Sequence, residues 1–171
     1  DPMQMRRLFP VLLLAFALST NATAYLSDTL TVTFIDVGQG DSVLVQTPNG
    51  RAMLVDAGES WAAPAVTIGL AAEGITRLEY VVATHDHADH IGGMIGVLPM
   101  VTVGQFVSNG VPASTQTAAN LRTYLSTHAI PTDAATAGDT LALDPANVSV
   151  TVLNPPAAPG RDQNEASVVL R

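Results

Sequence analysis

Three of the four histidines in the chain lie in one segment, Thr84-His85-Asp86-His87-Ala88-Asp89-His90-Ile91-Gly92-Gly93. In an extended chain alternate residues share a face, so His85, His87 and Asp89 can project into one pocket. If the chain turns into a helix at residues 88–89, His90 reaches the same pocket from the first helical turn. Four side chains with nitrogen or oxygen donors then converge, which predicts a metal site.

The side chains available define the chemistry of this site. The chain has no cysteine, so a metal must be held by imidazole and carboxylate groups. This donor set favours Zn, is compatible with Mn or Fe, and argues against copper(I) and iron–sulfur chemistry. Two other interpretations stay open at this point. One is a structural site for a single metal, and the other is a solvated turn that binds none.

The sequence around the histidines predicts a layered α/β fold. Asn49-Gly50 between two apolar runs is a strong hairpin signal, and the apolar centre of 78–84 is typical of a strand buried between layers. Hairpins followed by strand–helix alternation indicate a mixed β-sheet with flanking helices. We expect strands at 29–35, 42–47, 51–56, 78–84, 101–107, 141–143, 148–153 and 167–170, and helices at 61–73, 91–98 and 114–129.

Length and composition favour one folded domain. Of the 171 residues 47% are hydrophobic, which is enough to build a core and argues against intrinsic disorder. Aspartate and glutamate number 15 against 7 basic residues, all of them arginine, and the net charge is −8. Because no basic run could follow a phosphate backbone, broad electrostatic binding of nucleic acid is disfavoured.

Residues 1–24 predict a signal peptide. Arg6-Arg7 precedes an apolar run over 8–18 that is too short to span a bilayer, and Ala22-Thr23-Ala24 has the small-residue pattern of a signal peptidase site. We therefore expect export to the bacterial periplasm or the cell exterior, with no stable membrane anchor after cleavage. The alternative is an uncleaved helix, buried or lying on a membrane surface.

Three motifs resemble the metallo-β-lactamase superfamily. His85-x-His87-x-Asp89-His90 matches its metal-binding signature, and residues 33–42 and 54–58 resemble more narrowly the ComEC-type metallo-hydrolase domains of DNA-uptake competence proteins. The resemblance covers about residues 30–170. It implies that residues 25–171 are the N-terminal part of the four-layer αβ/βα sandwich of this family, a mixed β-sheet with flanking helices whose C-terminal half is missing.

The resemblance also implies roles for individual residues. His85 and His87 would bind one divalent metal ion, and Asp89 and His90 a second, with Asp89 also taking part in catalysis. Asp56 would support the metal-binding loop, because a ligating imidazole needs its other ring nitrogen held. Without the resemblance, Asp56 is equally well interpreted as a turn residue.

Other positions have weaker signals. Gly38, Gly40 and Asp41 are expected either in a loop at the substrate cleft or in a plain tight turn. Residues 162–170 occupy the region of a further family histidine but contain none, so Asp162 or Asn164 is predicted to substitute as an oxygen ligand. The fourth histidine, His128, is expected on the surface at a helix end.

These implications lead to three functional hypotheses. The first is an exported hydrolase with a metal-activated water, acting on a small-molecule or phosphodiester substrate, with single-stranded DNA as the substrate if it is a nuclease. The second keeps the fold and the metals, with an acyl substrate such as a thioester, lactone or β-lactam. The third is a truncated, non-catalytic fragment with partial metal occupancy. An uncovered sheet at 167–170 would also favour self-association.

Overall fold

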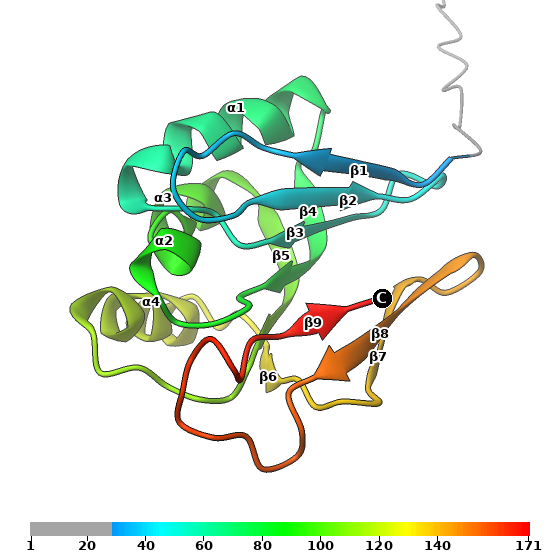
Figure 1. The fold of residues 1–171 in the computed structure, drawn as a ribbon. Helices are drawn as coiled ribbons and strands as arrows, with labels where there is room; N and C mark the ends of the chain where they lie inside the picture. The colour runs from blue at the N-terminus through cyan, green and yellow to red at the C-terminus, as the bar shows by residue number, and fades with distance from the viewer. Residues whose placement is uncertain (1–28) are drawn as a thin grey trace, which may run out of the picture.

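The computed structural model describes residues 29–171, so the predicted signal peptide lies outside the described residues. Two sheets and a set of helices make up this part of the chain (Figure 1). The larger sheet has six strands in the order β1-β2-β3-β4-β5-β6, and the smaller has three in the order β7-β8-β9. Within this part of the chain, no helix is long and apolar enough to cross a membrane.

The larger sheet is mixed, as expected. Its first three strands are joined antiparallel, and the pairs from β3 onward are parallel. Gly50 has a φ of +75° in the β2–β3 hairpin, a conformation that glycine adopts without steric cost. The strands are β1 (Thr31–Phe34), β2 (Val43–Gln46), β3 (Ala52–Val55), β4 (Arg77–Val82), β5 (Thr102–Ser108) and β6 (Thr132–Ala134).

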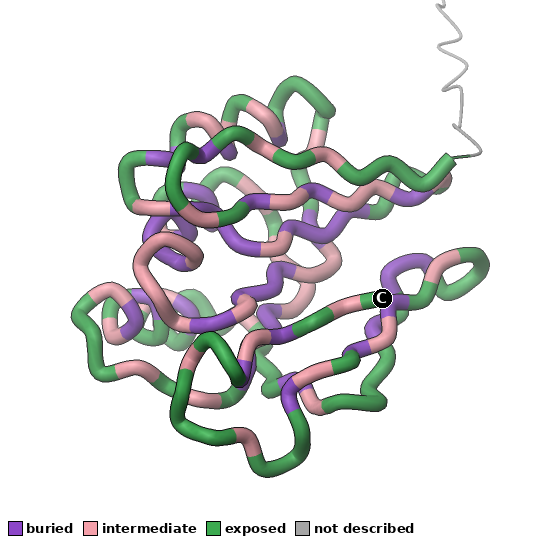
Figure 2. Tube along the Cα trace, viewed as in Figure 1, coloured by how far each residue is buried: buried purple, intermediate pink, exposed green. Residues whose placement is uncertain are grey.

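Helices cover one face of this sheet. The long helices are α1 (Ala63–Ala72), which follows the 3₁₀ turn η1 (Ser60–Ala62), and α4 (Gln116–Thr127). Their buried side chains join those of the central strands in one core, which includes Leu54, Val66, Leu78, Val81 and Leu121. Figure 2 shows the buried residues concentrated between the helices and the sheet.

The smaller sheet packs toward the opposite face. It consists of β7 (Thr140–Asp144), β8 (Val148–Asn154) and β9 (Val169–Leu170). Leu143 and Val152 share a second core with Val82 and Val107 of the larger sheet. Strand β4 is therefore buried on both sides, which is why its centre is apolar at consecutive positions.

Two sequence predictions were wrong in detail. The helix expected at 91–98 is broken into α2 (Ala88–Ile91), α3 (Met94–Val97) and the 3₁₀ turn η2 (Leu98–Met100). The break falls at Gly92-Gly93, where the backbone lies so close to residues 57–60 that a side chain would collide with it. Strand β6 was not predicted, because three exposed residues without apolar alternation have no strand signal.

Candidate metal centre

The histidine segment leaves the C-terminal end of β4 and turns into α2. His87 is extended, with φ −76° and ψ 149°, and the helix begins at Ala88. The chain therefore changes from extended to helical where the spacing of the histidines required it. His90 lies in the first turn of α2 and returns toward His85.

The structure brings together the four predicted ligands. The ring centroids of His85 and His90 are 4.1 Å apart, and those of His85 and His87 are 4.7 Å apart. His85 Nε2 lies 3.1 Å from His87 Nδ1, and Asp89 Oδ2 lies 3.9 Å from His90 Nε2. His85 is buried, and the other three are partly exposed. These side chains line one site that solvent can reach.

Asp56 anchors this cluster from beneath. It is fully buried directly after β3, with a φ of +57°. Its carboxylate accepts hydrogen bonds from Thr84 N at 2.8 Å, from Thr84 Oγ1 at 2.6 Å and from His90 Nδ1 at 2.8 Å. The supporting position predicted for Asp56 matches this geometry. Thr84 was missed, because a threonine at a strand end carries no sequence signal for such a contact.

These hydrogen bonds define which ring nitrogens carry protons. His90 Nδ1 donates to Asp56, so His90 Nε2 keeps its lone pair. The single proton of the Thr84 hydroxyl goes to Asp56, so Thr84 Oγ1 can only accept from His85 Nδ1, 3.0 Å away. His85 Nε2 therefore keeps its lone pair as well. Both rings are held in the tautomer that a metal ligand needs.

The same environment shifts the two imidazole pKa values in opposite directions. Burial lowers the pKa of His85, and the neighbouring His90 and His87 lower it further. The hydrogen bond to the Asp56 carboxylate raises the pKa of His90, against the effect of burial. Burial is thus the main influence on His85, and the Asp56 carboxylate is the main influence on His90.

The glycine loop before β2 packs against the metal segment. Gly40 has a φ of +86°, and its Cα lies so close to the Asp89 carbonyl that no side chain would fit between them. Gly38 has a φ of +72° and lies against the ring of Trp61, an exposed residue. Asp41 Oδ2 is 3.9 Å from His90 Nδ1 with its side chain 71% exposed. The loop is therefore both a tight turn and one rim of the site.

Asp162 and Asn164 do not contact the cluster. Asp162 Oδ1 instead accepts hydrogen bonds from the N–H groups of Asn164 and Glu165. Among residues 29–171, no hydrogen bond joins Asp162 or Asn164 to a histidine. The side chain of this segment that reaches the site is Ser167, whose hydroxyl lies 3.3 Å from His85 Nδ1.

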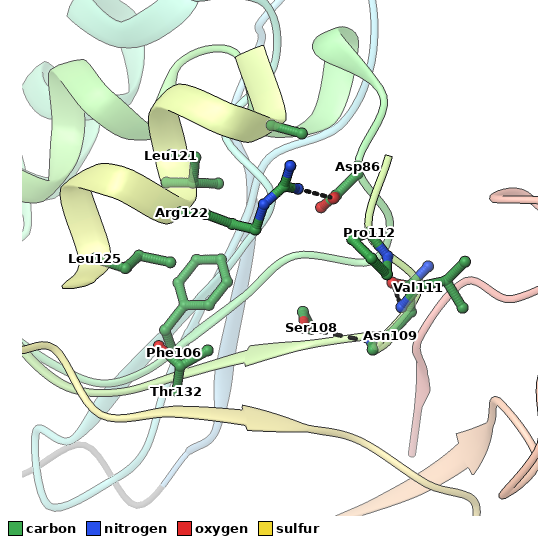
Figure 3. A pocket seen from close by; sticks show the side chains of 12 residues that line it. Asp86, Phe106, Ser108, Asn109, Val111, Pro112, Leu121, Arg122, Leu125 and Thr132 are labelled. Carbon is green, nitrogen blue, oxygen red and sulfur yellow. Dashed lines mark hydrogen bonds and ion pairs between the residues drawn. The ribbon is translucent and has the colours of Figure 1, made fainter. Parts of the chain in front are cut away.

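Asp86 points to the other side of the segment. Its Oδ2 accepts from Ala113 N at 3.0 Å and pairs with Arg122 at 3.2 Å. Beyond this pair lies a cavity of about 240 Å³ against α4, with Phe106, Leu121 and Leu125 as its apolar floor (Figure 3). His128, as expected, lies exposed at the end of α4, where it stacks on Tyr124.

The donor set fits a divalent ion in its chemistry, since it offers imidazole nitrogens and a carboxylate. Within residues 29–171, no three such side chains are arranged around one centre. His85 Nε2 is instead within hydrogen-bond distance of His87 Nδ1. His85, His87, Asp89 and His90 are the residues that would hold a metal, and their role as ligands stays a prediction.

Parts of this chain are similar to known proteins in sequence and fold. Residues 35–107 match the family model described as the metallo-beta-lactamase superfamily. The solved metallo-beta-lactamase SMB-1, bound to 2-mercaptoethanesulfonate, has a TM-score of 0.58 at 19% identity, over 81% of this chain and 54% of that one. A metallo-beta-lactamase mutant of Cronobacter sakazakii has a TM-score of 0.52 at 18% identity, over 71% and 49%. These likenesses show the fold.

These matches support the metallo-beta-lactamase superfamily as the family of residues 35–107. Within it, the chain resembles the competence proteins of the ComEC type. Competence protein ComA of Neisseria gonorrhoeae is 41% identical over 96 residues, which is 54% of this chain and 14% of that protein. The chain thus spans a small part of that relative and about half of the solved structures above.

Proposed function

We propose that this chain holds the histidine-containing metal site of an exported metal-dependent phosphodiesterase, with nuclease activity as in competence-type domains. The observation that carries the proposal is the cluster of His85, His87 and His90, held by buried Asp56. The similarity to a competence protein supports a phosphodiester substrate over an acyl one.

The chain's own residues would divide the work. A bound divalent ion would supply an activated water and an electrophilic contact for an anionic substrate oxygen. His85 and His87 would hold one ion, and Asp89 and His90 another. Asp56 fixes the orientation of His90 directly and that of His85 through Thr84. Asp89, partly exposed beside His90, is the predicted residue for binding and proton transfer at the reacting centre.

The charge of the chain limits the substrate. Asp41 is exposed at the rim of the site, and the net charge of the chain is −8. These negative charges do not attract a long polyanion. Substrate binding would therefore depend on contacts at the metal rather than on a basic groove along a phosphate backbone. A short single-stranded DNA or a small phosphodiester is therefore the substrate we propose.

Hydrolysis of a chromogenic phosphodiester, bis(p-nitrophenyl) phosphate, and of a labelled single-stranded oligonucleotide tests this proposal. Turnover should require added Zn²⁺ or Mn²⁺ and should be lost in Asp89→Asn, with His128→Ala as a control outside the site. Turnover of thioester, lactone or β-lactam substrates, with none of either phosphodiester, would instead establish the acyl hypothesis.

Metal analysis addresses the non-catalytic hypothesis. A stoichiometry of two ions per chain would exclude a degenerate one-metal site, whereas one ion and no turnover of any substrate would support it. Export is tested by N-terminal sequencing of the protein from the periplasm and medium of a bacterial host, where cleavage after Ala24 is the expected result.

A further inference from the structure

One short segment, residues 163–168, contacts three consecutive residues of the histidine loop. Gln163 Oε1 accepts from Asp86 N at 2.9 Å, Ser167 Oγ lies 3.3 Å from His85 Nδ1, and Val168 N donates to Thr84 O at 2.9 Å. The segment comes just before β9, about eighty residues further along the chain. It forms a second support for the loop, in addition to Asp56.

Ser167 completes the hydrogen bonding of His85. Its hydroxyl donates to Gln163 O at 3.4 Å, so its oxygen accepts toward His85 Nδ1. Thr84 Oγ1 accepts there as well, because its own proton goes to Asp56. Two oxygen acceptors thus face one nitrogen, which keeps the proton on Nδ1 and the lone pair on Nε2.

Gln163 fixes the backbone on either side of this contact. Its Nε2 donates to Val111 O at 2.8 Å, while its Oε1 accepts from Asp86 N and from Asn109 Nδ2, at 3.3 Å. The fixed backbone groups of Asp86 and Val111 define which end of the amide is oxygen. A carboxylate of the same shape would place an oxygen against the Val111 carbonyl. The site therefore requires an amide, and it ties the histidine loop to the loop after β5.

We propose that Ser167 and Gln163 are positioning residues for the metal site, with Ser167 setting the tautomer of His85 and Gln163 setting the path of the loop. This inference rests on the proposed function in taking His85 as a metal ligand. It assigns these two residues a role that acts through the histidine loop, whereas the sequence predicted Asp162 or Asn164 as an oxygen ligand.

Metal affinity and imidazole tautomers test the proposal on the whole chain. Co²⁺ and Zn²⁺ affinities are measured by competition with a chromophoric chelator, and long-range ¹H–¹⁵N NMR of the metal-free protein reports the His85 tautomer. Ser167→Ala should weaken metal binding about 10-fold, the lower range for loss of a group that orients a ligand. Ser167→Thr, which keeps the hydroxyl, should retain the wild-type affinity.

Gln163→Glu tests the amide without changing its size. It should weaken metal binding and shift the Asp86 amide resonance, because the new oxygen repels Val111 O. Ser126→Ala and Gln116→Ala are matched controls, since both side chains form exposed hydrogen bonds within helix α4. Neither control should change metal affinity or the His85 signals.

Two results would overturn the proposal. One is the detection of a proton on His85 Nε2 in the wild-type protein. This measurement does not depend on whether any variant folds. The other is wild-type metal affinity in both Ser167→Ala and Gln163→Glu. Hydrolysis is a separate readout from metal affinity. If the wild-type protein cleaves no phosphodiester but Ser167→Ala weakens metal binding, the proposed function fails and the positioning role stands.

Discussion

Asp56 shows how one buried carboxylate can organise a loop 28 residues away. Its two oxygens accept three hydrogen bonds, from both the backbone and side chain of Thr84 and from His90. A positive φ is uncommon outside glycine, but Asp and Asn adopt it more readily than other residues. The position therefore selects for a small side chain that can carry charge and accept several hydrogen bonds.

Two substitutions of Asp56 should separate the effect of its charge on stability from the effect of its shape. Asp56→Ala leaves buried donors of Thr84 and His90 unpaired and should cost about 3 kcal/mol of unfolding free energy, the upper range for a buried hydrogen bond to a charged group. Asp56→Asn keeps the shape and the backbone preference, and should cost less. Urea unfolding measures both. Equal losses in the two variants would contradict a role for the carboxylate charge.

Substitutions at Gly40, in the loop before β2, and at Gly50, in the β2–β3 hairpin, form a matched pair. Together they test how closely the loop before β2 packs. Both glycines have positive φ, so an alanine at either position pays about 1–2 kcal/mol for the left-handed backbone. Open space surrounds Gly50, whereas a Cβ at Gly40 would collide with the Asp89 carbonyl. Gly40→Ala should therefore destabilise the protein well beyond Gly50→Ala and should lower metal affinity. Thermal unfolding and chelator competition test this, and equal effects would disprove the close approach.

The sequence predicts the residues of the site unevenly. His85, His87, Asp89 and His90 lie within six residues, so local spacing alone suggests that they meet. The support from Gln163 and Ser167 spans 77 and 82 residues, and it depends on how the last segment crosses the sheet. A serine and a glutamine in a connector carry no signal of that path.

At the scale of elements, periodicity and turn chemistry predict most of the strands and the two long helices. The wrong predictions fall where contacts with distant parts of the chain determine the secondary structure. Helix α2 ends because Gly92 and Gly93 let the chain pass close to η1 and residue 57, and β6 exists because Phe106, Val107 and Ser108 of β5 pair with it. Neither effect is present in the local sequence.

Strand β4 carries an ion-pair cluster that predicts a pH dependence. Glu79 accepts from Arg77 at 3.0 Å and pairs with Arg51, just before β3, at 3.0 Å. The hydrogen bond from Arg77 holds the pKa of Glu79 below its ordinary value of 4.5. Because the folded-state pKa is the lower one, this stabilisation is present above pH 4.5 and is lost as pH falls through the folded-state pKa.

Glu79→Gln should therefore destabilise the protein at neutral pH and leave it unchanged in strong acid. Both arginines are about half exposed, so added salt should reduce the difference at neutral pH. Urea unfolding of the variant and the wild type from pH 7 downward, at low and high salt, measures this. A difference that persists in strong acid would show that packing rather than charge explains the loss.

At the scale of the whole molecule, the larger sheet separates two cores. Val81 belongs to the core beneath the helices and Val82 to the core beneath the smaller sheet. Asn49 Nδ2, in the β2–β3 hairpin, also donates to Asp144 of β7 at 2.7 Å, which joins the two sheets at one end. The histidine segment leaves β4 between the two cores, so both layers determine its position.

Exposed apolar side chains lie on β1 as well as where the sequence suggested, since Val169 of β9 is 46% exposed. Val168 is buried before β9, and Leu170 pairs with Val152 of β8. Strand β1 is at the edge of the larger sheet, and the alternating residues Leu30, Val32 and Phe34 are exposed, Phe34 by 79%. An apolar edge strand is a template for pairing with another chain. Self-association, which the sequence predicted, stays a prediction, now assigned to this edge.

Phe34→Lys should suppress that association, because an ammonium group on an edge strand opposes pairing with a second apolar edge. Sedimentation velocity over a range of protein concentrations measures it, with concentration-dependent growth expected for the wild type and a monomer for the variant. Ile68→Lys is the matched control, since Ile68 is an exposed apolar residue on α1 and should not alter association. If the wild type is monomeric throughout, or if both variants suppress association equally, the edge of β1 is not the contact.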